Sequence, residues 1–317
     1  MFAHIPVLNF LEQIGATSSI SEIWGVSGGA IIGLYYSMGV SPKEMKSVGL
    51  GLLKAHKKLK LIPSGFSILN KLFRESLLPN LSLVDEQLHT NHLFKGFHDC
   101  QADLQDIVSR VVQPQARFPF YCLAYNLKTH QNDILTAAPI PERVYPDWIV
   151  QTDPKDAVVA SSAIPILFVP KVIAHHRKKR LYVDGSTVED VPTESIYKKW
   201  ILDKQLGLEK RKRLLVIAVG FTPYFTSFGF LENWLLRRFP GFHYFFLSAY
   251  YADLMRQART KVQKTLLKDD PNVELIDFNF KMPRGSLMDI RRIPQVMQIA
   301  EKACPRLFGT VNDSLLI

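Results

Sequence analysis

The sequence predicts an α/β fold in which helices cover both faces of a mostly parallel sheet. Apolar segments of strand length alternate along the chain with segments of helix length, the order that parallel sheets require. The run Leu214–Val219 is uniformly apolar, as expected of a strand buried on both faces. The segment Gly25–Gly29 joins a short apolar strand to an apolar helix by a tight glycine-rich turn.

The expected elements follow one another along the whole chain. A first helix is expected at 1–14, where Ile5, Leu8, Leu11 and Ile14 recur at i+3 spacing. Residues 41–110 are expected to be helical, with Ser41-Pro42 at the start. Strands are expected at 20–24, 118–127, 134–135, 166–173, 181–183, 214–219 and 273–278. Further helices are expected at 30–36 (ending near Gly39), 156–162 and 290–304, and in the aromatic-rich stretch 221–260.

Length and composition predict one globular domain over 1–317, with chemical motifs in 1–220 and a helical, aromatic part in 221–317. The 317 residues are 47% hydrophobic and 21% charged, which excludes wholesale disorder. Cys100, Cys122 and Cys304 are odd in number and widely spaced, so neither a disulfide framework nor a metal site is expected. We see no signal peptide and no apolar stretch long enough to cross a bilayer, and expect a cytoplasmic protein.

The net charge of +10 favours a polyanionic partner. Two runs, Lys54–Lys60 and His175–Arg180, are strongly basic, and aromatic residues of 225–251 are interleaved with Arg237 and Arg238. Such segments are typical of proteins that attach peripherally to anionic membranes. A plain solvated surface is the alternative. No zinc spacing or nucleic-acid motif accompanies the charge, so no nucleic-acid partner is expected.

Gly25-Val26-Ser27-Gly28-Gly29 has the pattern G-x-S-x-G. A tight turn from a strand into a helix strains the backbone and exposes the serine hydroxyl at the carboxyl edge of the sheet. We expect Gly25 and Gly29 to lack side chains because a Cβ there would collide with the neighbouring strand or helix. Ser27 is therefore a candidate nucleophile, and a purely structural turn is the alternative.

Asp184 is the candidate base for this serine. It follows the expected strand 181–183 and precedes Gly185-Ser186, so we expect it at the same carboxyl edge as Ser27. A carboxylate with the usual pKa of about 3.9 is a weak base toward a hydroxyl, and burial would strengthen it. Asp-Gly is also a common turn signal, which leaves a structural role open.

Taken together, three blocks of sequence resemble the patatin-like phospholipases. The order and spacing of the blocks carry the resemblance over about residues 1–220. The first helix also looks like the helix that follows a glycine-rich loop in that family. The blocks are Gly25–Gly29, Ala160-Ser161-Ser162-Ala163-Ile164-Pro165 with Phe168 and Pro170, and Asp184-Gly185-Ser186 with Pro192.

The resemblance implies a three-layer α/β/α patatin-like fold and a serine esterase of the phospholipase A type. Ser27 would be the nucleophile and Asp184 the general base of a Ser-Asp dyad. The backbone N–H of Gly28 would donate to the oxyanion, and Gly25, Gly29 and Gly185 would be motif glycines. Its substrates would be phospholipids or other acyl-ester lipids, with no cofactor and no metal.

Two departures from the family pattern bear on activity. Ser186 stands where the family has glycine or alanine, and its small side chain should be tolerated. The family's first strand and glycine-rich oxyanion loop would precede Ala3-His4, whereas this sequence begins at Met1-Phe2. Losing one oxyanion donor typically costs ~10²–10³ in turnover. A catalytically impaired lipid- or partner-binding protein is therefore the alternative function, and a soluble esterase for short acyl chains is a third.

A Ser-His-Asp triad is the alternative catalytic arrangement. His243 follows Asp184 in the required chain order, but the segment Gly241–Phe245 reads as packing or interfacial. The α/β-hydrolase topology needs several strands before the serine, and only a short segment precedes Gly25. His4 is expected to be structural, and His175 and His176 are expected to be turn residues.

Overall fold

A computed structural model describes residues 2–47, 50, 116–140, 144–163, 170–176, 178–222, 255, 258–281 and 293–308. Several expectations fall outside these residues. They are residues 166–169 of the strand expected at 166–173 (of which 171–173 lie in strand β5, Lys171–His175), most of the helical region 41–110, the run Lys54–Lys60, Arg177, the aromatic segment 225–251, Cys100 and His243.

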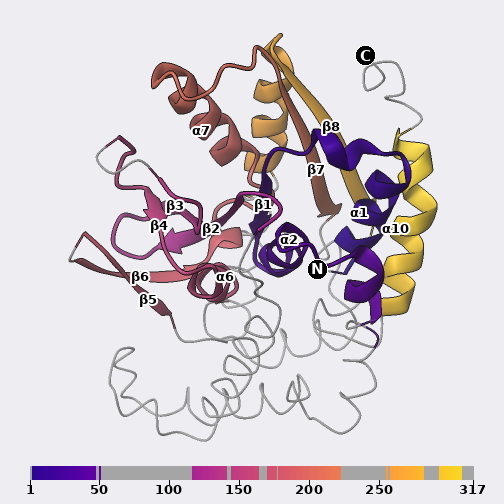
Figure 1. The fold of residues 1–317 in the computed structure, drawn as a ribbon, viewed down its shortest axis with the longest axis horizontal. Coiled ribbons are helices and arrows are strands. Elements are labelled where there is room, and N and C mark those ends of the chain that lie inside the picture. The colour runs from indigo at the N-terminus through magenta and orange to yellow at the C-terminus, as the bar shows by residue number, and fades with distance from the viewer. Residues whose placement is uncertain are drawn as a thin grey trace, which may run out of the picture.

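The larger sheet has six strands (Figure 1). Five lie in the order β4-β3-β2-β6-β5, and β1 pairs with β2 in parallel. Strands that follow each other in the sequence form the antiparallel hairpins β2–β3 and β5–β6. The short polar turns between these strands are typical of hairpins. The strands are β1 Ile23–Val26, β2 Phe120–Asn126, β3 Gln131–Thr136, β4 Ile149–Gln151, β5 Lys171–His175 and β6 Lys178–Asp184.

A second, two-stranded sheet consists of β7 Leu214–Thr222 and β8 Val273–Lys281, paired in parallel. The described strands therefore form a mixed arrangement: β1–β2, β3–β4 and β7–β8 are parallel, and β2–β3, β2–β6 and β5–β6 are antiparallel. The α/β fold class is confirmed, and the antiparallel direction of β6 has consequences for the position of Asp184.

Helices lie on both faces of the larger sheet (Figure 1). On one face, α2 Gly28–Ser37 and α6 Pro154–Ser161 bury a core that includes Leu34, Cys122 and Val158. On the other face, Val26, Leu123 and Ile134 are buried against residues that include Leu202. This leucine belongs to α7 Thr193–Gln205, so the sheet is the middle of three layers.

A buried lysine ties helix α7 to the residue that precedes β1. Lys199 is 4% exposed, and its Nζ lies 3.1 Å from Glu22 and 2.7 Å from Asp203. Its ammonium also lies 4.6 Å from the ring centre of Tyr121. Breaking one partner of such a buried pair leaves an uncompensated charge, so the lysine holds α7 in place on the strand that leads to Ser27.

The first and last helices pack on the second sheet. Helix α1 His4–Gln13 and helix α10 Ile293–Phe308 share a core with β8, in which Val7, Phe278 and Ala300 are buried. No helix among the described residues is long and apolar enough to cross a bilayer.

A cavity of about 850 Å³ separates the two sheets. Consecutive residues of β1, Ile23–Val26, line one side, and consecutive residues of β7, Leu214–Val219, line the other. Residues of α1 line it as well, including Leu8 and Leu11. Consecutive strand residues at a cavity wall mean that strand edges, and not only one face, border it.

The expected positions of α1, β1, α2, β2, β3, α6, β6, β7, β8 and α10 are confirmed to within a few residues. The sequence analysis missed β4 and α7. Strand β4 has only three residues, too few for an alternating pattern to stand out. Helix α7 carries charged residues on most sides and is anchored by the ion pairs of Lys199 and not by a broad apolar stripe.

Gly25 and Gly29, on either side of Ser27, differ in whether the structure leaves room for a side chain. A Cβ on Gly25 would lie 2.5 Å from the Cα of Ala30, so no side chain fits between β1 and α2. A Cβ on Gly29 would lie 3.4 Å from His4 Nε2, an ordinary contact. The expectation that both glycines exclude a side chain for steric reasons is confirmed for Gly25 and wrong for Gly29, because Gly29 faces a side chain and not a backbone.

We therefore expect Gly25→Ala to lower the free energy of unfolding by roughly 2–3 kcal/mol, since overpacking against backbone cannot relax by rotation. The matched control Gly29→Ala should change it by less than about 1 kcal/mol, because alanine is also the better helix residue. Urea unfolding monitored by circular dichroism measures both. Equal losses in the two variants would contradict the steric argument.

Candidate active site

Ser27 lies between β1 and α2 in a strained backbone conformation. Its φ and ψ are 53° and −125°, angles that belong to the first central residue of a type II′ turn and normally to glycine. Holding a residue there costs about 1–3 kcal/mol unless surrounding structure enforces it. The side chain is partly exposed, as the strand–turn–helix pattern predicted.

Two serines at the end of α6 hold this conformation on both sides of the peptide. The N–H of Ser27 donates to Ser161 Oγ at 3.0 Å, and Ser162 Oγ donates to the carbonyl of Ser27 at 3.1 Å. Ser161 is fully buried and Ser162 is 7% exposed. We call residues 161–162 the serine clamp. Its two hydrogen bonds link segments more than 130 residues apart in the chain.

Asp184 ends β6, which runs antiparallel to β2 and not, as the sequence analysis assumed, parallel to it. The assumed direction was wrong, but Asp184 still lies at the edge where β1 ends and Ser27 follows, as expected. Only the last three residues of β6 overlap β2, and Asp184 pairs with Ala124.

This short overlap brings Asp184 level with Ser27. In the parallel pair β1–β2, Val26 lies beside Leu123, and the next residues along the two strands are Ser27 and Ala124. Strand β3 occupies one edge of β2, so β1 and β6 share the other edge. Strand β1 ends beside Leu123 and β6 ends beside Ala124, so the ends of the two strands that carry Ser27 and Asp184 meet.

The end of α6 also touches Asp184. The backbone N–H of Asp184 donates to the carbonyl of Ala163 at 2.9 Å. Residues 161–163 therefore bond Ser27 through both of its peptide groups and Asp184 through its N–H. One segment thus sets the positions of both candidate residues relative to each other.

The turn after Asp184 is tightly packed. Asp184 is 1% exposed, and its Oδ1 accepts a hydrogen bond from the N–H of Ser186 at 2.8 Å. A Cβ on Gly185 would lie 2.3 Å from the carbonyl oxygen of Leu123, which explains the glycine. Asn132 Nδ2 donates to the carbonyl of Gly185 at 3.1 Å. Burial strengthens a carboxylate as a base, as the candidate role requires.

A cluster of buried polar side chains anchors the part of β6 that precedes Asp184. Asp133 Oδ2 accepts hydrogen bonds from Asn126 at 2.7 Å, Tyr182 at 2.8 Å and Arg180 at 3.2 Å. Burial raises the pKa of Asp133, and these three donors oppose the rise. The cluster ties β6 to β2 and β3 beside the short overlap that carries Asp184.

Glu189 is a second buried carboxyl near Asp184. It is 2% exposed, and burial raises its pKa to about 7. Its oxygens accept from the N–H of Glu194 at 2.8 Å and from the hydroxyl of Ser195 at 2.7 Å. These donors belong to the first turn of α7, so Glu189 caps that helix.

Gly28, the candidate oxyanion donor, is the first residue of α2. The first N–H groups of a helix have no acceptor within the helix and carry partial positive charge. The position of Gly28 directly after Ser27 therefore suits a donor to an oxyanion formed there.

The histidines in the described part of the chain lie away from Ser27 or pack structurally. His4 begins α1 and borders Gly29. His176 lies in the β5–β6 turn with φ 47°, as expected, whereas the expectation was wrong for His175, which is the buried last residue of β5. Burial lowers the pKa of His175, and His176 and Arg180 lower it further. His243 lies outside the described residues.

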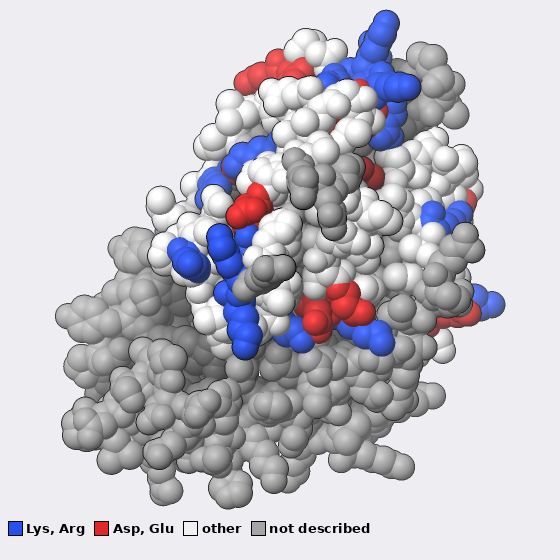
Figure 2. Space-filling view, turned by 60° about the vertical axis from the view of Figure 1, so that its left-hand side comes forward, with Lys and Arg blue, Asp and Glu red and all other residues white. Residues whose placement is uncertain are grey.

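Lysine and arginine side chains gather at several places on the surface, with acidic side chains among them (Figure 2). Lys178 and Lys179 are exposed on the β5–β6 hairpin. Placing Arg180 on this basic surface was wrong: it is 8% exposed and pairs with Asp133 at 3.2 Å and Asp147 at 3.3 Å. The analysis also missed the exposed basic run 210–213.

Sequence reasoning assigned no role to the serine clamp or to Asn132. Ser161 and Ser162 were noted only as part of a family block, and the block itself was the signal available. Asn132 gave no signal, because its contact with Gly185 joins residues 53 positions apart.

Comparison with known proteins identifies the family. The family model for patatin-like phospholipases matches residues 1–197, which include Ser27, the serine clamp and Asp184. Among solved structures, VipD from Legionella pneumophila is similar over 98% of this chain with 14% sequence identity and a TM-score of 0.41, and the chain spans 64% of the VipD chain. The search of curated proteins found no match. The chain belongs to the patatin-like phospholipase family.

Proposed function

We propose that this protein is a lipid acyl hydrolase that cleaves carboxylic esters of membrane lipids through Ser27 and Asp184. Family membership supports hydrolysis of lipid esters. The observation that carries the dyad is that β1 and β6 end next to each other on the same edge of β2, with Ser27 and Asp184 at these ends and residues 161–163 bonded to both. Strain at Ser27 and burial at Asp184 are the conditions that a nucleophile and a base require.

In the proposed reaction, Asp184 accepts the hydroxyl proton of Ser27 as Ser27 Oγ attacks the ester carbonyl carbon. The negative charge that develops on the carbonyl oxygen is stabilised by the N–H of Gly28 at the start of α2. Collapse of the tetrahedral intermediate expels the alcohol, which takes the proton from Asp184, and leaves an acyl group on Ser27. Asp184 then activates a water that hydrolyses the acyl-enzyme.

The first prediction tests the dyad. Ser27→Ala and Asp184→Asn should each lower kcat for phospholipid hydrolysis by at least about 10³-fold, and the double variant should be hardly worse, because the two residues act as a unit. Asp156→Asn, which changes a partly exposed carboxylate on α6, should keep full activity. Fatty acid release from phospholipid vesicles is the measurement.

Three results would contradict this proposal. Substantial turnover by folded Asp184→Asn would remove the aspartate as base and return His243 to consideration. An inactive wild-type chain that still binds lipid would favour the impaired lipid- or partner-binding alternative. Hydrolysis limited to short acyl esters in solution would favour a soluble esterase.

A second prediction concerns the serine clamp. Ser161→Ala removes the acceptor of the Ser27 N–H, so the strained turn should relax and kcat should fall by about tenfold to 100-fold while KM changes little. Ser37→Ala is the matched control, because Ser37 is also fully buried but bonds the carbonyl of Leu34 within α2. The two variants should lose similar stability, so the kinetic difference isolates positioning.

Ser161→Thr should recover part of the lost kcat because its hydroxyl can still accept from Ser27. If the kcat of Ser161→Ala matches that of Ser37→Ala, the clamp supports the fold and does not set the nucleophile.

We further propose that the enzyme binds anionic membranes through the β5–β6 hairpin. Strand β6 overlaps β2 only from Tyr182 onward, so its first residues, Lys178 and Lys179, extend past Asn126 at the end of β2. Ser27 follows the end of β1, which is parallel to β2. The exposed lysines thus lie on the same side of the sheet as the nucleophile, where a lipid would enter.

We expect Lys178→Gln/Lys179→Gln to weaken co-sedimentation with anionic vesicles by about tenfold or more at low salt, since each lysine contributes ~1 kcal/mol. High salt should weaken wild-type binding by screening. The control Lys210→Gln/Lys212→Gln removes the same charge from the segment before β7 and should bind nearly as wild type. Equal loss in both variants would indicate general charge attraction without a defined docking surface.

A further inference from the structure

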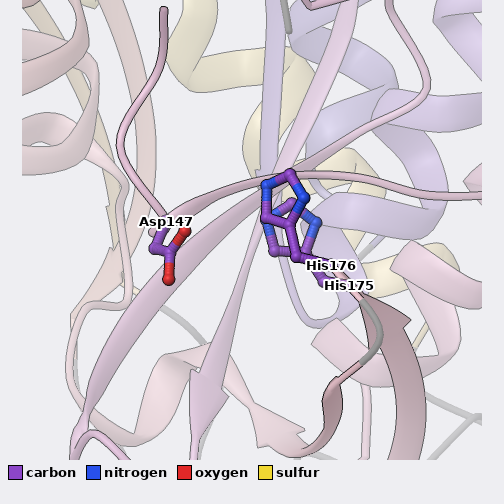
Figure 3. Close-up of side chains that lie close together, drawn as sticks. All are labelled: Asp147, His175 and His176. Carbon is purple, nitrogen blue, oxygen red and sulfur yellow. The ribbon is translucent and has the colours of Figure 1, made fainter. Parts of the chain in front are cut away.

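Three metal-ligating side chains meet at the turn of the β5–β6 hairpin (Figure 3). His175 ends β5, His176 follows in the turn, and Asp147 lies in the segment before β4. One ligand atom from each residue lies within 4.8 Å of those of the other two. The imidazole ring centres of the histidines are 3.9 Å apart. Figure 3 shows the two rings together, opposite the Asp147 carboxylate.

His175 provides an independent sign that a ligand belongs here. It is 9% exposed, and its Nε2 is buried with no hydrogen-bond partner among the described residues. Buried polar atoms in native proteins nearly always have a partner, which is a protein group, an ordered water or a bound ion. A metal ion bound to the lone pair of a neutral imidazole supplies such a partner.

Asp147 is held in place for such a role. Arg180 donates to the backbone carbonyl of Asp147 at 2.6 Å, and its guanidinium lies 3.3 Å from Asp147 Oδ2. A carboxylate has two oxygens, so an arginine on one orients the group while the other can ligate a cation. The charge of Arg180 is also balanced by the buried Asp133 at 3.2 Å.

We propose that Asp147, His175 and His176 bind a zinc ion, with water in the fourth position. Two imidazoles and a carboxylate are a donor set that zinc prefers, and nitrogen donors disfavour calcium and magnesium. Tetrahedral ligands at zinc bonds of about 2.0–2.1 Å lie about 3.3 Å apart. Asp147 and His176 are exposed, so rotation of their side chains can close the remaining distance.

The zinc would act as a cross-link and not as part of the esterase site. Asp184 lies six positions along β6 from Lys178, which is next to the hairpin turn, a path of about 20 Å. The ion would join the β5–β6 hairpin to the segment that enters β4, on the other side of β2 and β3 in the sheet order. The positive charges of the exposed Lys178 and Lys179 repel a bound cation. Binding therefore requires a strong ligand set such as this one.

The test is zinc binding to the full chain by isothermal titration calorimetry, together with thermal unfolding in zinc, calcium or magnesium. We expect one zinc per chain and a rise in the thermal midpoint with zinc alone, because a ligand bound only to the folded state stabilises it. His176→Ala and Asp147→Asn should each weaken binding at least about tenfold and remove the rise.

His130→Ala is the matched control, since His130 is also an exposed hairpin-turn histidine with positive φ, 57°, outside the cluster. It should bind zinc as wild type does. His176 is exposed, so His176→Ala should fold even if a variant of the buried His175 does not. The test therefore does not depend on a His175 variant. The absence of zinc binding by wild type, or equal binding by His176→Ala and His130→Ala, would overturn the proposal. Both readouts are independent of ester hydrolysis.

Discussion

The backbone of Ser27 adopts angles that a residue with a side chain keeps only when neighbours enforce them. The enforcement comes from Ser161 and Ser162, which bond the N–H and the carbonyl of Ser27 from the end of α6. Helix α6 packs on the same face of the sheet as α2, the helix that Ser27 begins. Core packing between the two helices and the sheet is therefore what allows the strained turn to persist.

The same dependence extends to Asp184. Its N–H bonds the carbonyl of Ala163, one residue past the serine clamp. Because β6 is antiparallel to β2 and overlaps it over three residues, a shift of one residue in register would turn Asp184 to the opposite face. The buried cluster of Asp133, Tyr182 and Arg180 opposes such a shift. Sheet register, and not the loop alone, thus sets where the candidate base lies.

The early part of β6 has a different set of partners from its end. Lys178 and Lys179 are exposed, Arg180 points to two aspartates, and the preceding His175 and His176 lie beside Asp147. One strand therefore carries a proposed membrane contact and adjoins a proposed zinc site at its start, and carries the proposed base at its end. The start and the end of β6 are about 20 Å apart. Residues at the start can therefore be mutated without altering the candidate base at the end.

By itself, the sequence determined the elements whose signals are local. Periodicity located α1 and α10, apolar runs located β7 and β8, and G-x-S-x-G placed Ser27 between a strand and a helix. Four features became apparent only from the folded structure. They are the direction of β6, the hydrogen bonds of the serine clamp to Ser27, the room for a side chain at Gly29 and the burial of Arg180. Each of these depends on which distant segments become neighbours. Pairing direction and hydrogen bonds between residues over a hundred positions apart leave no periodic trace in a single sequence, whereas helix and strand patterns repeat within a few residues.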